Sequence, residues 1–154
     1  MERTDEETFP EELADALVGV QRLLRRRLRA GLTVPRLRGA EVELLRLVES
    51  RPGIGVSEAA KELHLAGNSV STLVNQLAKE GHLVRETDPA DRRAARLLLT
   101  EQAEARLRDW KQRRVALVGR QLARLDTAEQ EALRAALPAL RALAVTLQEE
   151  AEES

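Results

Sequence analysis

The sequence predicts a mainly helical fold that carries one small β-hairpin. Apolar residues recur at steps of three and four along most of the 154-residue chain, which is the period of amphipathic helices. In the middle of the chain, two short apolar runs flank a segment rich in turn-forming residues, which is typical of a hairpin. No repeat and no low-complexity linker divides the chain. We therefore expect a single domain over residues 1–154, with helices on both sides of the hairpin.

The composition excludes several classes of protein. Hydrophobic residues make up 43% of the chain, which is enough for a core, yet no apolar run is long enough to cross a membrane. The acidic segment 1–10 lacks a signal-peptide pattern, so we expect a cytoplasmic protein. With no cysteine and two histidines, the chain predicts no metal site and no cofactor. Aromatic residues are 1%, which disfavours recognition of single strands by base stacking.

The first predicted helix ends in a basic run. Its apolar stripe consists of Leu13, Leu17, Val20, Leu24 and Leu28. The arginines at 25–27 are a candidate contact to a nucleic-acid backbone or an ordinary solvated helix end. Gly31 and Pro35 then end the helix.

Three helices are predicted next, over residues 38–50, 56–63 and 68–80. Ser57 is a candidate N-cap for the second of these, and Gly81 suits the end of the third. A helix of about eight residues, a short turn with glycine and a second amphipathic helix form the helix-turn-helix pattern. Residues 82–85 and 95–99 then predict the two strands of the hairpin.

Long helices are predicted after the hairpin. One covers residues 101–125, and Asp126 with Glu129 resembles a capping box at the start of the next. The leucine stripes of the first and last helices exceed what one small globule can bury, so we expect a second copy of the chain to cover them. Trp110 is a candidate for a ligand pocket or for the dimer core.

One helix face carries the functional prediction. If the apolar residues of the helix at 68–80 face inward, its other face presents uncharged polar residues and one lysine. These are Asn68, Ser69, Ser71, Thr72, Asn75, Gln76 and Lys79. No carboxylate lies among them to repel phosphates. Asparagine and glutamine pair bidentately with adenine, and serine and threonine reach base edges or phosphates.

The hairpin tip supplies the complementary feature. Arg92 and Arg93 lie in the turn, with Arg96 nearby, and arginine is favoured in the narrow minor groove of DNA. Asp91 is positioned to orient a guanidinium. The predicted contact is a helix in the major groove and a hairpin wing in the adjacent minor groove.

The segments 56–77 and 88–100, the latter with its Asp-Pro-Ala-Asp-Arg-Arg turn, resemble the MarR (multiple antibiotic resistance regulator) family. The resemblance implies dimerisation helices at 11–34 and 101–149 around a DNA-binding winged helix-turn-helix at 36–100. It also implies a homodimer on a pseudo-palindromic double-stranded operator, usually a repressor released by a small anionic or aromatic effector. Thr72 stands where many members carry a basic residue. Ala66-Gly67 replaces the usual capping serine, so we expect Asn68 to cap the recognition helix.

Two other interpretations compete with a DNA-binding regulator. The polar face at 68–79 is also compatible with an ordinary solvated helix, and the acidic overall balance is compatible with a helical protein-interaction module. An enzyme is not expected, because the sequence contains no nucleophile-base set and no phosphate-binding glycine loop.

Overall fold

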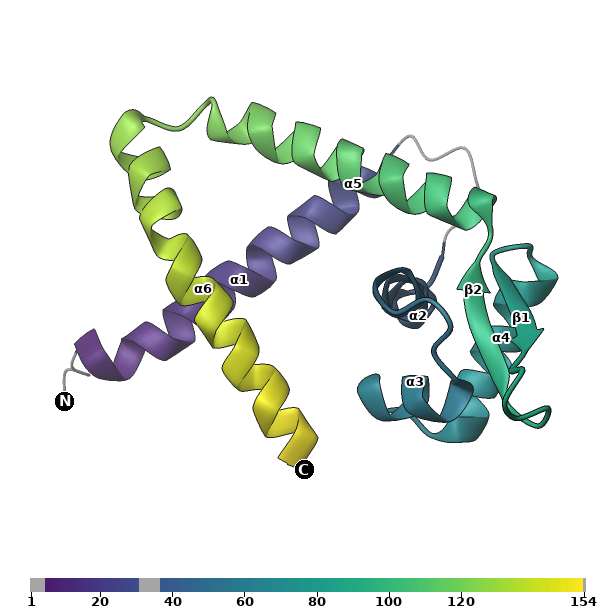
Figure 1. Ribbon diagram of the computed structural model, residues 1–154. Coiled ribbons are helices and arrows are strands. Elements are labelled where there is room, and N and C mark those ends of the chain that lie inside the picture. The colour runs from purple at the N-terminus through teal and green to yellow at the C-terminus, as the bar shows by residue number, and fades with distance from the viewer. Residues whose placement is uncertain (1–4, 31–36, 154) are drawn as a thin grey trace.

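The computed structural model describes residues 5–30 and 37–153. It is a mainly helical protein with a two-stranded antiparallel hairpin, as predicted (Figure 1). The elements in order are α1 Asp5–Arg29, α2 Gly39–Ser50, α3 Val56–Glu62, α4 Gly67–Lys79, β1 Leu83–Thr87, β2 Ala95–Leu99, α5 Glu101–Leu122 and α6 Thr127–Glu153. Gly31, Pro35 and the predicted boundary between the N-terminal helix and the winged region lie outside the described residues.

The core lies where α2, α3 and α4 pack on the hairpin. Its fully buried side chains come from α2 (Leu44, Leu45, Val48), α4 (Val70, Val74, Leu77) and β2 (Leu97). The spacing in α4 is four and three residues, so the three apolar side chains fall on one helix face. This confirms the predicted inward face of α4 and leaves its polar face outward.

Two residues with a left-handed backbone conformation turn the chain at the ends of α3 and α4. At Gly81 φ is +81°, and the N–H of His82 donates to the carbonyl of Leu77 (2.8 Å). At His64 φ is +52°, and the N–H of Leu65 donates to the carbonyl of Ala60 (3.0 Å). Both bonds span six residues, the pattern of a Schellman C-cap. The second turn is the corner between the two helices of the helix-turn-helix.

A loop segment pairs with the free edge of the two-stranded hairpin. Leu83 pairs with Leu99 and Thr87 with Ala95 in β1 and β2. On the other edge of β2, Gly53 N–H donates to Leu97 C=O (2.8 Å) and Leu97 N–H donates to Ile54 C=O (3.0 Å). The α2–α3 loop therefore acts as a short third partner that ties the hairpin to the helices.

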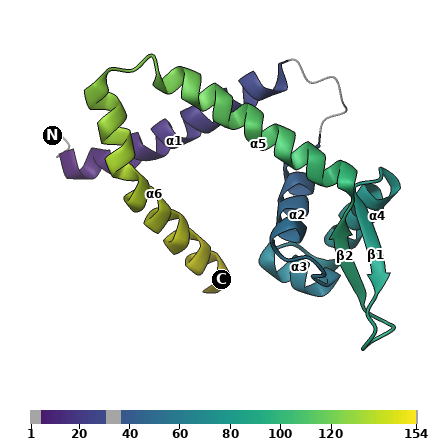
Figure 2. The same ribbon diagram turned by 45° about the horizontal axis from the view of Figure 1, so that its top comes forward.

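Helix α5 connects the winged region to the rest of the molecule (Figures 1 and 2). It begins at a capped end, because Thr100 Oγ1 accepts from Ala103 N–H (3.1 Å) and donates to Gly81 C=O (2.7 Å). Helix α6 begins with the predicted capping box between Asp126 and Glu129 (2.8 and 3.0 Å). None of the residues of α6, 127–153, is buried. Among the described residues no helix has both the length and the hydropathy of a membrane span.

Two predicted helix caps were wrong. Helix α3 starts at Val56 with Gly55 as N-cap, and α4 starts at Gly67 with Ala66 as N-cap. The corner at His64 brings the backbone of Ala66 into the extended conformation immediately before the helix, so Asn68 already lies inside the first turn of α4. From that position its side chain cannot accept the N–H bonds that an N-cap accepts.

Candidate nucleic-acid interface

The polar face of α4 is open to solvent. All seven residues predicted to contact DNA from this helix are exposed: Asn68, Ser69, Ser71, Thr72, Asn75, Gln76 and Lys79. The buried residues Val70, Val74 and Leu77 hold the opposite face on the core. The structure thus brings these seven side chains onto one accessible surface, which we call the α4 face.

Several side chains of the α4 face are oriented by neighbours. The Thr72 hydroxyl donates to the carbonyl of Asn68 (2.9 Å), and Gln76 Nε2 donates to Glu80 Oε1 (2.6 Å). Asn75 Oδ1 accepts a hydrogen bond from the guanidinium of Arg85 on β1. Such bonds orient the polar groups that a ligand would meet.

The start of α4 has unoccupied backbone donors. No side chain caps the helix at Ala66, and no acidic residue lies in its first turn. The first amides of a helix have no intrahelical acceptor, and together with the helix dipole they favour an anion such as phosphate. The end of α4 that reaches the helix-turn-helix corner is therefore electrostatically suited to a nucleic-acid backbone.

The hairpin tip is built by two aspartates. Asp88 Oδ1 accepts from Ala90 N–H and Asp91 Oδ1 accepts from Arg93 N–H, both at 2.9 Å. Arg92 and Arg93 are exposed in this turn. Asp91 was predicted to orient a guanidinium, but in the described chain its carboxylate bonds the backbone instead. The backbone amide two residues on is within closer reach than a flexible arginine head.

Arg96 lies on β2, in the second strand pair from the hairpin turn, and outside the tip itself. It pairs with Glu86 across the strands, and it forms a bridge with Gly55 on the other edge. Its guanidinium covers Gly53, where a Cβ would lie 2.7 Å from an Arg96 nitrogen. Gly53 has φ of +86°, a conformation that glycine adopts without strain. Arg96 thus packs the wing onto the α2–α3 loop.

Sequence reasoning missed two arginines of this region. Arg51, just after α2, bridges Glu58 and Glu62 of α3 and holds α3 on the end of α2. Arg85 contacts Asn75 of the α4 face. The sequence does not predict either contact. Each one joins residues of two different elements, and the periodicity of a helix or strand relates only residues within one element.

A buried histidine lies behind the interface. His82, between α4 and β1, is 4% exposed, and its Nε2 is 3.3 Å from Arg106 of α5. Its Nδ1 is buried and has no hydrogen-bond partner in the described part of the chain. Burial, and after it the charge of Arg106, lowers the pKa of His82 below its ordinary 6.5. The ring is therefore neutral at physiological pH.

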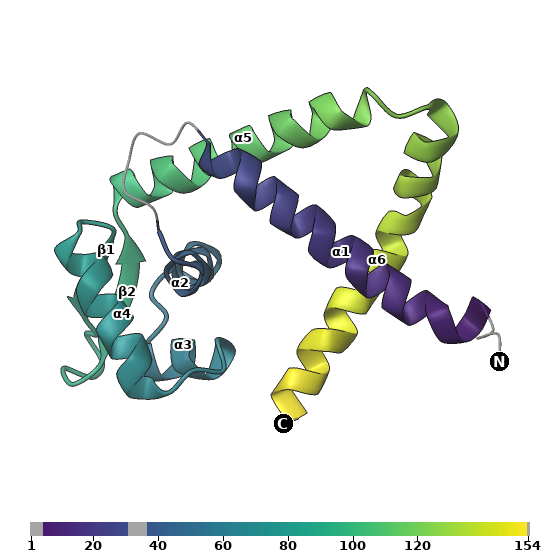
Figure 3. The same cartoon turned by 180° about the vertical axis from the view of Figure 1, so that it is seen from behind.

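The recognition helix and the wing lie on the same side of the molecule. In Figures 1 and 3 the hairpin lies beside α4, at the edge of the molecule away from α1 and α6. The contacts between α4 and β1 hold the two elements together.

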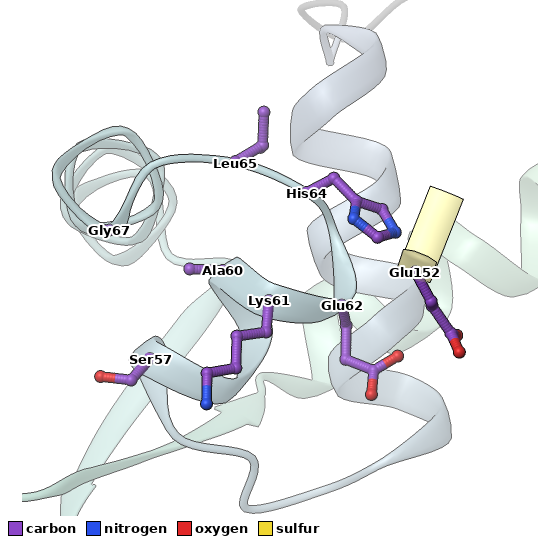
Figure 4. Close-up of a pocket in the computed structure, with 8 residues that line it drawn as sticks. All are labelled: Ser57, Ala60, Lys61, Glu62, His64, Leu65, Gly67 and Glu152. Carbon is purple, nitrogen blue, oxygen red and sulfur yellow. The ribbon is translucent and has the colours of Figure 1, made fainter. Parts of the chain in front are cut away.

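A hollow of about 730 Å³ lies between α3 and the end of α6, lined by residues that include Lys61, His64 and Glu152 (Figure 4). It places the acidic end of α6 close to the helix-turn-helix corner.

The family model described as the MarR family matches residues 30–94 of this sequence. This stretch of the chain is similar to the MarR family. The match covers the α4 face and the hairpin tip described above, and it confirms the resemblance seen in the sequence. No curated protein matches the chain.

Solved structures resemble the fold of almost the whole chain. FabT of Streptococcus pneumoniae, solved in complex with DNA, is 23% identical with a TM-score of 0.72, covering 93% of this chain and 99% of FabT. A MarR family protein from Bacillus stearothermophilus is 20% identical with a TM-score of 0.75, covering 93% and 99%. The transcriptional regulator Tm0710 from Thermotoga maritima is 25% identical with a TM-score of 0.66, covering 88% and 92%.

Proposed function

We propose that this MarR-family chain is a sequence-specific, double-stranded-DNA-binding transcriptional regulator of the cytoplasm. MarR-family regulators are generally non-enzymatic transcription factors, and we propose the same here. The observation that carries the proposal is that the α4 face is exposed and that the hairpin packed against α4 carries the exposed tip arginines Arg92 and Arg93. This arrangement suits a helix in the major groove with a wing in the neighbouring minor groove.

We propose that the protein acts as a homodimer on a pseudo-palindromic operator. Helices α1 and α6 expose apolar side chains that one chain does not cover, among them Val18 at 64% and Leu147 at 60% exposure. A second copy would bury them and would carry a second α4 face. The resemblance adds the expectation that the two recognition helices lie about 34–36 Å apart, one turn of DNA.

We further propose that the regulator is a repressor released by a small anionic or aromatic effector. A hollow of about 440 Å³ on α5 combines the cationic residues Arg108 and Lys111 with the apolar Val115 and Ala116. Charge and apolar surface in one hollow suit an aromatic carboxylate. A coupling of about 1–3 kcal/mol between effector and operator is enough for several-fold to hundredfold release. The half-buried Trp110 stays a candidate for the pocket or the dimer core.

The direct test is binding to the DNA upstream of the protein's own gene. Fluorescence anisotropy at several salt concentrations should show binding that prefers this DNA to a scrambled duplex. The double variant Arg92→Ala, Arg93→Ala should bind more weakly and with a shallower dependence of log K on log salt, by about 1 for each phosphate that the variant no longer binds. A wild-type chain that shows no sequence preference at moderate salt, or a double variant that binds equally well, would contradict a DNA-binding function and would favour the interaction module.

A further inference from the structure

We propose that α1 carries a self-complementary seam, on which α1 of a second copy packs antiparallel about a two-fold axis between Gly19 and Val20. The seam rests on the proposed function, because only a homodimer brings two such surfaces together. It adds to that function the orientation and the register of the two α1 helices, and the residue pairs that fix them.

One side of α1 is left open by the rest of the chain. Val20 is 59% exposed and Leu23 is 53% exposed, and a Cβ added at Gly19 would meet no neighbouring atom within 4 Å. By contrast, Leu28 is buried and Leu24 is half-buried toward the rest of the chain, where α1 contacts α5. From there α1 extends away from the winged region, so a second copy can reach its open side (Figures 1 and 3).

The residues on this open side form the α1 seam. They recur at steps of three and four, which keeps them on one helix face. The members are Glu12, Ala16, Gly19, Val20, Leu23 and Arg27. Their positions are symmetric about the point between Gly19 and Val20. A two-fold axis at this point exchanges the two ends of the seam, so the seam can pack on a second copy of itself.

Small residues lie opposite large ones across this axis. Gly19 faces Val20 of the second copy, and Ala16 faces Leu23. Large side chains that meet small ones fill an interface without voids and let two helices approach closely. Each pair occurs twice, so assembly buries the exposed valine and the exposed leucine of both copies.

Opposite charges meet at the two ends of the α1 seam. Glu12 faces Arg27 of the second copy, and both side chains are exposed in the single chain. Every charged residue from 5 to 15 is acidic, and every charged residue from 16 to 30 is arginine. Antiparallel packing sets each acidic half beside a basic half, whereas parallel packing sets like charges side by side. The helix dipole favours this order only in the first and last turns, and Glu12 lies beyond the first turn.

The first test exchanges the charges of the full-length protein and measures the dimer dissociation constant by analytical ultracentrifugation. Glu12→Arg and Arg27→Glu should each raise it by about tenfold, because a symmetric interface gains two like-charge contacts. Both changes in one chain should restore assembly to within about threefold of the wild type, and so should an equal mixture of the two single variants. The differences should shrink in about 1 M salt.

The second test uses a chain that has no cysteine of its own. Val20→Cys places a thiol beside the two-fold axis, so mild oxidation should cross-link two copies. Val18→Cys is the matched control, because Val18 is 64% exposed and residues two apart on a helix do not face the same way. It should stay largely uncross-linked under the same conditions.

Three outcomes would overturn the α1 seam while the homodimer stands. These are single charge variants that assemble like the wild type, single variants that neither the double exchange nor mixing rescues, and cross-linking at Val18 as fast as at Val20. A wild-type protein that stays monomeric in the ultracentrifuge at micromolar concentration would instead overturn the proposed homodimer, and the seam with it.

Discussion

Gly81 shows how one backbone conformation positions the interface. Its φ of +81° ends α4 and directs the chain into His82 and β1. A side chain there is disfavoured by the left-handed conformation, and a Cβ would also lie 3.4 Å from Gln102 Oε1. The same residue's carbonyl accepts the Thr100 hydroxyl that caps α5 (2.7 Å). Three elements therefore depend on this glycine.

Gly81→Ala should destabilise the fold by about 1 to 2 kcal/mol, the cost of a non-glycine residue in the left-handed region. Urea denaturation followed by circular dichroism measures it. Gly67→Ala is the control, since Gly67 opens α4 with free space around its Cβ position and should be neutral or slightly stabilising. Equal stability of the two variants would contradict the role given to Gly81.

The buried His82 makes stability depend on pH. Because burial and Arg106 lower its pKa in the folded state, the unfolded chain binds the proton more readily. The stabilising contribution is present above the unfolded value of about 6.5 and is lost as the pH falls below it. The smaller effects of Glu80 and Glu41 act in the opposite direction.

We expect the free energy of unfolding to fall between pH 7.5 and pH 5.5, and to fall less in His82→Leu than in the wild type. Parallel urea titrations at the two pH values give the difference. His64→Gln, which keeps the buried ring and changes an exposed histidine, should retain the wild-type dependence. A His82→Leu variant with the wild-type dependence would show that other groups cause it.

At the scale of elements, the wing is fixed to the helices through β2. Arg96 covers Gly53, and the backbone bonds of Gly53 and Ile54 to Leu97 join β2 to the α2–α3 loop. These interactions set the direction in which the tip arginines Arg92 and Arg93 extend. We infer that Arg96 acts on DNA binding through this position.

Arg96→Ala should therefore weaken operator binding while leaving the slope of log K against log salt close to the wild-type value, because the variant still binds the same phosphates. Arg92→Ala is the matched variant and should lower the slope by about 1 if its guanidinium meets a phosphate. Anisotropy titrations across a salt series distinguish the two. A lower slope for Arg96→Ala would return Arg96 to the DNA-contacting residues.

The elements were predictable from the sequence where the period was strong. The apolar spacing of Val70, Val74 and Leu77 placed α4 and its outward face correctly. The turn residues at 88–93 placed the hairpin. The N-caps at Ser57 and Asn68 were wrong, since the caps at Gly55 and Ala66 use the extended backbone and no side chain.

Contacts between elements could not be predicted. The hydrogen bond from Arg85 to Asn75 and the packing of Arg96 on Gly53 depend on how β1 and β2 are placed against the helices. A sequence period describes one element at a time, so it identifies exposed polar residues and not their partners. The partners decide how an exposed amide is oriented.

At the scale of the whole molecule, the winged region has a core and α6 has none. The exposed apolar residues of α6 include Leu133, Leu137, Val145 and Leu147. Leu137→Glu should raise the dissociation constant of the proposed homodimer by about a hundredfold or more, since a symmetric interface buries two carboxylates at several kcal/mol each. Analytical ultracentrifugation measures it.

Glu131→Lys changes the charge of the same helix at a polar position and should leave the assembly intact. A Leu137→Glu chain that sediments like the wild type would place the dimer contact elsewhere. A wild-type chain that sediments as a monomer at micromolar concentration would contradict the homodimer itself.

A helix of 27 residues without a buried side chain has a consequence for the cell. Helices in water gain most of their stability from packing, so we expect α6 to be fully formed only when another copy is near. Folding of this segment then follows the number of copies per cell. In a newly expressed regulator, α6 would stay partly unfolded until enough copies have accumulated. The fraction of operator sites that are bound would then rise more steeply than the number of gene copies.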